Sequence, residues 1–327
     1  MVKERVSINS SITSKVYYFL VRYGIFFFFA SFYTVIALIH PGFISPGNII
    51  DILTETSVLS FVALGEAIVI AAGAVDLSLG NIASYGAMLT CYFISNQNLG
   101  VGWSIIIGVV VGGIIGVANG ILISRMYMNS LIATLGTGFV LVGFLYMLTF
   151  GQNIMVFSET FDQIGMGSFL SIPIPLYAMG LMLVFCHVFM EKTRYGRQIQ
   201  LIGGNMEACR LSGVPIKNLT CLAFVICGLL SPLSGILLSA RQGLSNVDMG
   251  ERFMLQAFTA AMLGTVILGG KNLIIGTFFG CIFLISLING LALLGAGPQW
   301  TYFAQGALLL ASILLNYYSK KVLSRRN

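Results

Sequence analysis

Long apolar runs dominate this chain of 327 residues, which is 57% hydrophobic and only 9% charged. A soluble globular protein has about 25% charged residues, so this composition cannot cover a water-facing surface. The runs continue for roughly 18 to 24 residues, the length that a helix needs to cross about 30 Å of hydrocarbon. Strands of a membrane barrel would alternate polar and apolar residues instead. The sequence therefore predicts an all-α polytopic membrane protein.

The apolar runs predict about ten membrane-spanning helices in a single transmembrane domain that covers residues 1–327. The third and eighth runs are short and rich in small residues, so we expect either one to be a broken or partly inserted helix. The predicted spans are 18–39, 49–72, 80–95, 103–123, 131–150, 172–190, 218–239, 254–270, 273–295 and 300–317.

Positive charge indicates how these spans are oriented. With the N-terminus in the cytoplasm, every Lys and Arg except Arg241 and Arg252 falls in a cytoplasmic segment, as the positive-inside rule requires. Both termini are then cytoplasmic, and so is the polar loop 191–217 after the sixth span. Five spans on each side of this loop suggest two halves related by inversion, as in many transporters. The short segments 75–77 and 247–249, VDL and VDM, stand in corresponding places.

No sequence pattern indicates a metal site or an enzyme active site. The six cysteines form no CxxC pair, so we interpret them as small hydrophobic groups. The motifs HExxH, GxSxG and GxxxxGK[ST] are absent. We expect no catalytic residue, no metal ligand and no cofactor bound by this chain. The net charge of +6 is assigned to membrane orientation rather than to nucleic-acid binding.

The loop 191–217 must meet water or a soluble partner, because it is polar and lies between two apolar runs. Asn205 is a suitable N-cap and Glu207 suits a first helical turn. Gly213 is a natural helix end, and Pro215 prevents continuation. The pattern predicts a helix of about two turns near 206–212, after a bend at Gly203-Gly204. Such a short helix is unstable alone, so it docks on a partner or packs on its own bundle.

The segment IGGNMEACRLSGV at 202–214 resembles the cytoplasmic coupling segment of permease subunits of ribose-type ABC importers. Glu207, Ala208 and Gly213 fall where the family has its EAA-type motif. Val266 and Leu268 stand where a loop of that family has serines. The other stretches that resemble family motifs are His40–Phe43 with Asn48, Ala72–Gly80, Ala133–Thr137, Gly151-Gln152, Gly264–Lys271 and Asn289–Gly295.

The resemblance implies a permease subunit of the bacterial inner membrane that imports a monosaccharide or related small polyol by alternating access. It also implies an ABC ATPase subunit that holds ATP and Mg, a second permease subunit, identical or paralogous, and an extracytoplasmic sugar-binding protein. The residues expected at the ATPase contact are Gly203, Gly204, Asn205, Glu207, Ala208, Arg210, Leu211, Ser212 and Gly213.

Polar groups within the spans are candidates for the translocation pathway or for a gate. Asp76 is expected to cap a helix, to mark a gate, or both. Glu66 lies about 15 Å from Asp76 along a continuous helix. Without a charged partner, Glu66 favours a structural hydrogen bond or a protonated carboxyl over a proton relay. The candidates are Glu66, Asp76, Ser78, Asn81, Asn119, Thr134, Thr137, Gln152 and Asn289.

Three alternatives remain open at this point. Within the importer class, the substrate could be a branched-chain amino acid or a nucleoside. An ion-coupled secondary transporter would instead need intramembrane charge pairs or discontinuous helices that bind an ion. The acidic outer rim predicts either a docking face for the binding protein or ordinary solvated loops. Its residues are Asp51, Glu55, Glu159, Asp162, Asp248 and Glu251.

Overall fold

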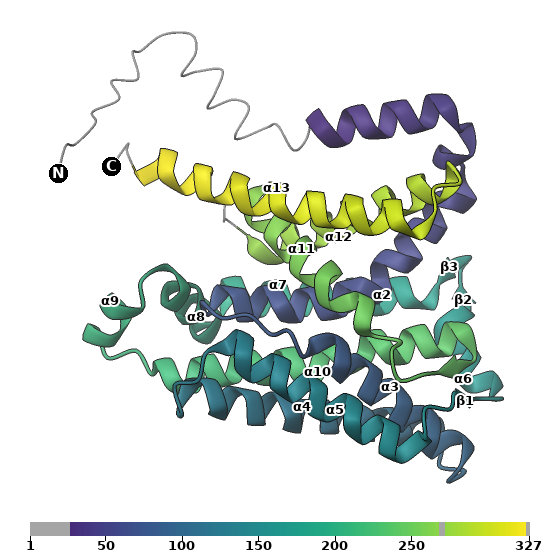
Figure 1. Cartoon of the computed structure of the whole chain (residues 1–327), viewed down its shortest axis with the longest axis horizontal. Helices are drawn as coiled ribbons and strands as arrows, with labels where there is room; N and C mark the ends of the chain where they lie inside the picture. Colours follow the sequence, from purple (N-terminus) through teal and green to yellow (C-terminus); the bar gives the residue numbers. More distant parts are fainter. Residues whose placement is uncertain (1–26, 268–271, 325–327) are drawn as a thin grey trace.

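The computed structural model describes residues 27–267 and 272–324, and these are almost entirely helical (Figure 1). A helix at Phe27–Ile39 and the 3-10 turn η1 (Pro41–Ile44) precede the first long helix. The next helices are α2 (Pro46–Ala71), α3 (Leu79–Ser95), α4 (Val101–Ser124) and α5 (Ser130–Thr149). After α6 (Glu159–Met166) come α7 (Ile174–Lys192), α8 (Arg194–Gly204) and α9 (Met206–Leu211). The last four are α10 (Ile216–Gln242), α11 (Glu251–Ile267), α12 (Leu273–Leu293) and α13 (Pro298–Ser324).

The predicted helical, multi-pass class is confirmed. Within the described residues, six helices are long and apolar enough to cross a membrane, namely α2, α4, α5, α7, α10 and α12. Each predicted span coincides with a helix, and the boundaries differ by a few residues. Residues 18–26 of the first span and 268–270 of the eighth lie outside the described residues. The count of ten spans and the position of the termini stay predictions.

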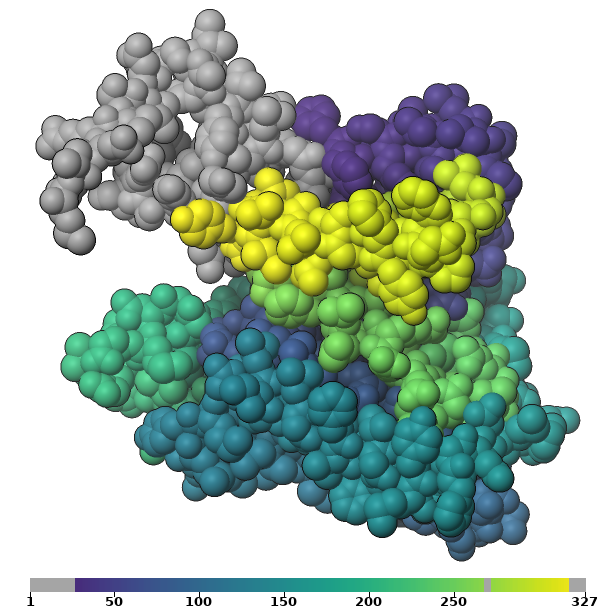
Figure 2. Space-filling model, in the orientation of Figure 1, coloured from purple at the N-terminus to yellow at the C-terminus, as the bar shows by residue number. Residues whose placement is uncertain are grey.

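The two ends of the bundle differ in structure (Figure 1). One end carries α6 and two small antiparallel sheets, in which β1 (Ile154–Met155) pairs with β4 (Leu244–Ser245) and β2 (Ser168–Phe169) with β3 (Ile172–Pro173). The opposite end carries α8 and α9, which project from the bundle at the left of the space-filling view (Figure 2). We call these the α6 end and the α9 end.

Helix α2 is the centre of the bundle. It packs against α10, α12, α11 and α7. In its apolar 18-residue stretch, 89% of the residues are buried inside the protein, whereas the figure for α7 is 22%. Ser45 caps its N-terminus by accepting a hydrogen bond from the Asn48 amide, with Pro46 at the first position. Pro suits this position because its missing N–H would have no helical partner there. A central helix of this kind positions polar groups away from lipid.

Helices α3 and α11 begin inside the bundle, next to each other. Gly80 and Gly250 are buried, and a Cβ on either would collide with the carbonyl oxygen of the other. The Gly250 amide donates to Ser84 Oγ at 2.8 Å. These are the predicted third and eighth spans, so their shortness reflects connections that enter the bundle before the helix starts.

Helix α4 packs closely on α3 and α10 through one row of glycines. Gly108, Gly112, Gly116 and Gly120 recur every fourth residue and so share one face of the helix. A Cβ at Gly116 would collide with the carbonyl oxygen of Phe224 on α10. Small residues allow such backbone contact in membrane bundles. The row explains part of the chain's glycine content.

We predict that Gly116→Leu separates α4 from α10 and costs about 1–3 kcal/mol of stability, because the added side chain meets backbone that cannot move aside. The measurement is the thermal midpoint of the purified protein in detergent. Gly143→Leu on α5 is the matched control, since a Cβ there meets nothing within 4 Å. Equal midpoints for the two variants would contradict the packing assigned to α4.

Candidate functional site

The polar loop 191–217 contains two helices at the α9 end rather than the one predicted. Helix α8 begins where Thr193 Oγ1 accepts a hydrogen bond from the Gly196 amide at 3.1 Å. Ile199 and Ile202 are buried against the bundle, and they lie on one face at a spacing of three residues. A Thr cap followed by this spacing was the sequence signal for α8, and the prediction missed it.

Helix α9 has the predicted caps. The Asn205 side chain accepts from the Ala208 amide at 3.0 Å. Arg210 and Glu207 form an exposed ion pair of 2.9 Å between Nη2 and Oε1, which contributes little to stability in water. Gly213, after the helix, has a φ of +70°, a conformation that favours glycine. The bend between α8 and α9 lies at Asn205, whose backbone is extended. The prediction placed it at Gly203-Gly204, but both glycines belong to the end of α8.

Helix α9 packs on its own bundle and also presents an open face. Cys209 is buried in the core cluster. Met206 and Leu211 are 53% and 80% exposed, although both are apolar. All the residues predicted for the ATPase contact lie in the exposed segment Gly203–Gly213. The structure thus gathers them on one projection, and their role in contacting an ATPase stays a prediction.

A buried polar cluster lies at the connection between α2 and α3. Glu66 and Asp76 are fully buried. The Asp76 amide donates to Glu66 at 3.2 Å from Oε2 and 3.4 Å from Oε1. Asp76 Oδ1 accepts from the amide of Ser78 at 2.9 Å and from its hydroxyl at 2.5 Å. Asp76 therefore holds Ser78, the residue before α3, but no described side chain caps the first amides of α3 itself, so the predicted cap on the next helix is not made. We call this group, with the residues below, the break cluster.

Side chains of α4 and α5 complete the break cluster. Asn119 Nδ2 donates to Ser78 Oγ at 2.8 Å, and the Thr137 hydroxyl donates to Asn119 Oδ1 at 2.7 Å. The Leu77 amide donates to Thr134 Oγ1 at 3.0 Å. Irregular backbone persists in a membrane protein only where such partners satisfy it. Six candidates predicted from sequence, namely Glu66, Asp76, Ser78, Asn119, Thr134 and Thr137, meet here.

The predicted separation of about 15 Å between Glu66 and Asp76 is wrong. That distance assumed one continuous helix, whereas α2 ends at Ala71 and the chain turns back over residues 72–78. The turn brings the Asp76 backbone onto the Glu66 carboxylate. The structural hydrogen bond predicted for Glu66 is therefore made, but to the adjacent connection rather than across to another helix.

The other three pathway candidates lie apart from these hydrogen bonds. Asn81, on the first turn of α3, lies against Gly138 of α5. Asn289 on α12 exchanges two hydrogen bonds of 3.0 Å with Asn48 on α2, so it joins two helices. Gln152 is exposed after α5. The structure therefore brings six of the nine predicted pathway residues together in the break cluster, and the other three lie outside its hydrogen bonds.

The α8–α9 projection touches the connection that holds the break cluster. A Cβ on Gly203 would collide with the carbonyl oxygen of Ala71, and Gly203 lies against Gly73. A cavity of about 730 Å³ lies beside this contact, and its lining includes Gly73, Glu207 and Lys217. The Lys217 ammonium lies 4.8 Å from the centre of the Tyr127 ring. The two predicted sites are thus physically adjacent.

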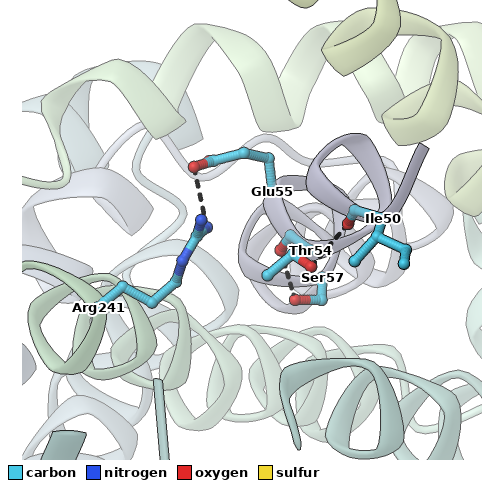
Figure 3. Close-up of polar contacts among 5 residues, drawn as sticks. All are labelled: Ile50, Thr54, Glu55, Ser57 and Arg241. Atoms are coloured by element: carbon cyan, nitrogen blue, oxygen red, sulfur yellow. Dashed lines mark hydrogen bonds and ion pairs between the residues drawn. The ribbon is translucent and has the colours of Figure 1, made fainter. Parts of the chain in front are cut away.

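Toward the α6 end, an ion pair joins α2 to α10. Arg241 Nη1 lies 2.8 Å from Glu55 Oε1 (Figure 3). The same picture shows Thr54 and Ser57 bonded to backbone carbonyls of α2 itself. Both partners of the ion pair were singled out in the sequence, Glu55 as rim charge and Arg241 as an exception to the charge bias. Their pairing could not be read from sequence because they are far apart in the chain.

The part of the chain that the structure describes contains no group of three or more His, Cys, Asp or Glu side chains that could hold a metal ion. Its main features are a helix break with buried polar side chains, a short projecting helix, and apolar helices long enough to cross a membrane.

Comparison with known proteins gives the family. Residues 48–313 match the family model described as the branched-chain amino acid transport system permease component. The L-arabinose ABC transporter permease protein of Azospirillum brasilense is 31% identical, over 91% of this chain and 88% of the relative. The ribose import permease proteins of Bacillus subtilis and Escherichia coli K12 are 33% and 31% identical. Both alignments cover 86% of this chain, with 88% and 89% of the relatives. No solved structure gives a match.

The chain therefore belongs to this family of ABC transport permeases, and it is a multi-pass membrane protein and a transport subunit. The resemblance seen in its motifs is confirmed.

We predict that Glu66→Leu destabilises the protein by about 1–3 kcal/mol, because the buried Asp76 amide loses its acceptor. Glu66→Gln keeps an acceptor oxygen and should retain most transport and stability. The measurement is the thermal midpoint of each variant, followed by uptake in cells. Complete loss of uptake in Glu66→Gln with normal folding would contradict a structural role and favour proton transfer.

Proposed function

We propose that this chain is the membrane-spanning subunit of an ATP-driven importer that moves a monosaccharide or related small polyol into the cytoplasm. The observation that carries the proposal is similarity to arabinose and ribose permeases over 86–91% of the chain. The description of the matching family model names branched-chain amino acid transport. Leucine, a branched-chain amino acid, is therefore the substrate with which sugars are compared in the tests below.

Energy comes from a partner ATPase, which binds ATP and Mg. The sequence has no phosphate-binding loop of its own. Met206 and Leu211 expose apolar surface beside the charged pair Glu207–Arg210. An amphipathic helix that fits a groove on another protein has this pattern. We assign the α9 end to the cytoplasm, because the basic residues of loop 191–217 lie there.

The remaining architecture follows from the same assignment. The chain crosses the membrane about ten times. Because this number is even, both termini lie on the same side, which the positive charge assigns to the cytoplasm. The connections 72–78 and 243–250 occupy matching places after α2 and α10, and the helices that follow them meet at Gly80 and Gly250, which supports two inverted halves. A second permease subunit, identical or paralogous, completes the pathway, and a sugar-binding protein docks at the α6 end.

An ion-coupled transporter is the second candidate. The observation that favours it is the buried Glu66 and Asp76 pair at a helix break, since transporters of that class bind ions at discontinuous helices. Against it, both Glu66 oxygens and Asp76 Oδ1 accept hydrogen bonds from backbone amides or from the Ser78 hydroxyl, although Asp76 Oδ2 has no partner among the described residues. Donors at these oxygens oppose the binding of a cation.

We predict that Glu207→Lys and Gly213→Pro abolish coupling to the ATPase. The first reverses charge on the docking face, and the second cannot adopt the positive φ at Gly213 because proline fixes φ near −65°. The measurement is transport-stimulated ATP hydrolysis by the complex in proteoliposomes, together with the amount of ATPase that co-purifies.

Gly47→Ala at the start of α2 is the control, because a Cβ there meets nothing within 4 Å and the position lies far from α9. Membrane insertion and purified yield of both test variants should equal those of the control. Normal ATP-driven transport by correctly inserted Glu207→Lys and Gly213→Pro would remove α9 as the coupling element.

A further inference from the structure

Three cavities lie next to one another in the half of the bundle nearer the α6 end. Their volumes are about 500, 230 and 530 Å³, and Arg252 on the first turn of α11 lines all three. The largest lies between α11 and α13. Its size falls within the range of about 300–1,000 Å³ that is typical of small-molecule sites. We call it the α11–α13 cavity.

Two buried carboxamides face the α11–α13 cavity from different helices. Gln256 on α11 is 8% exposed, and Gln305 on α13 is 9% exposed. Within the described residues, neither side-chain amide has a hydrogen-bond partner, whereas Asn48, Asn119 and Asn289 each have one. The amide ends of both glutamines are not among the fully enclosed unpartnered atoms, so they open onto the cavity that they line. Two unpaired amides that open onto one cavity can bind a polar ligand.

Charged and hydroxyl groups surround the two amides. Arg252 takes part in neither of the ion pairs formed among the described residues, and its guanidinium lies 5.3 Å from the centre of the Phe253 ring. Asp248, Thr301 and Tyr302 line the same cavity. The wall thus offers donors from Arg252, acceptors from Asp248 and Glu251, and both from the two glutamines. Apolar side chains complete it, namely Met254, Leu255 and Ile288.

This mixture suits a neutral molecule with several hydroxyl groups. Each hydroxyl both donates and accepts, as a carboxamide does, so the unpaired amides can each satisfy adjacent hydroxyls. Arg252 and Asp248 would also suit the two charges of an amino acid, but a branched apolar side chain would leave Gln256 and Gln305 unpaired. The buried amides therefore favour a polyol over leucine.

We propose that the α11–α13 cavity is a binding site for the transported monosaccharide within the permease itself, with Gln256 and Gln305 as its specificity-determining residues. The proposal rests on the proposed function and adds a defined site in the membrane domain. Arg252 places this site beside the other two cavities, which extend it toward Asp51 on α2 and Asn153 after α5.

The test uses the complete importer in proteoliposomes with saturating sugar-loaded binding protein. Gln256→Leu and Gln305→Leu should each lower sugar transported per ATP hydrolysed by about tenfold, as expected for one lost hydrogen bond. The basal ATPase rate and complex assembly should stay unchanged. Gln256→Asn keeps the amide and should recover part of the transport. Gln163→Leu on α6, which is exposed and lines none of the four cavities described above, is the control.

A second measurement detects occupancy without transport. Thr301→Cys introduces a thiol at the cavity wall, and its rate of modification by a maleimide should fall when ribose or arabinose is present at high concentration. Leucine at the same concentration should have no effect. The unsubstituted protein gives the background from its own cysteines.

The outcomes separate the two proposals. If the wild-type importer moves leucine and neither sugar, the proposed substrate class and the polyol assignment both fail. If the wild-type importer moves sugar but both leucine variants transport like wild type, or if sugar gives Thr301→Cys no protection, the site alone is overturned. A parallel fall in ATPase rate and assembly would also overturn it, because it would show a structural role for the two glutamines.

Discussion

The hydrogen bonds that satisfy the backbone between α2 and α3 are the constraint on which the rest of the structure depends. A helix that ends inside a membrane protein leaves amides and carbonyls that lipid cannot satisfy. Glu66 accepts from the Asp76 amide, Asp76 from Ser78, and Thr134 from Leu77. These contacts fix where α3 starts, and therefore where Gly80 meets Gly250 ahead of α11.

The same connection joins the bundle to its projecting helices. Gly203, at the end of α8, lies against residues 71–73, and only Gly204 and Asn205 separate it from α9. A displacement of α9 therefore reaches the break cluster through backbone contact rather than through a flexible side chain. Asn119 and Thr137 extend the hydrogen bonds to α4 and α5. This arrangement gives a physical route from a soluble partner to the centre of the bundle.

Much of the helical fold could be predicted from the sequence, because span length and helix caps are local signals. Asn205, Glu207 and Gly213 identified α9 by position alone. The break cluster was predicted only as separate residues, since contacts between α2, α4 and α5 depend on how the chain folds. The distance from Glu66 to Asp76 was wrong because it was measured along a continuous helix, although the predicted span ended at 72 and Gly73 takes a φ of +80° just after α2. Gln256 and Gln305 carried no local signal, because an unpaired amide is recognised only from its surroundings.

The central claim is that ATP bound by a partner drives transport through this chain. The most direct test is uptake of labelled ribose and arabinose by proteoliposomes that contain the permease, its ATPase and the binding protein. Ionophores remove all ion gradients, and ATP is supplied on the α9 side. The account predicts sugar uptake that requires ATP and persists without gradients. Uptake that ignores ATP and stops when a proton or sodium gradient is removed would contradict it, and would make Glu66 and Asp76 the coupling site.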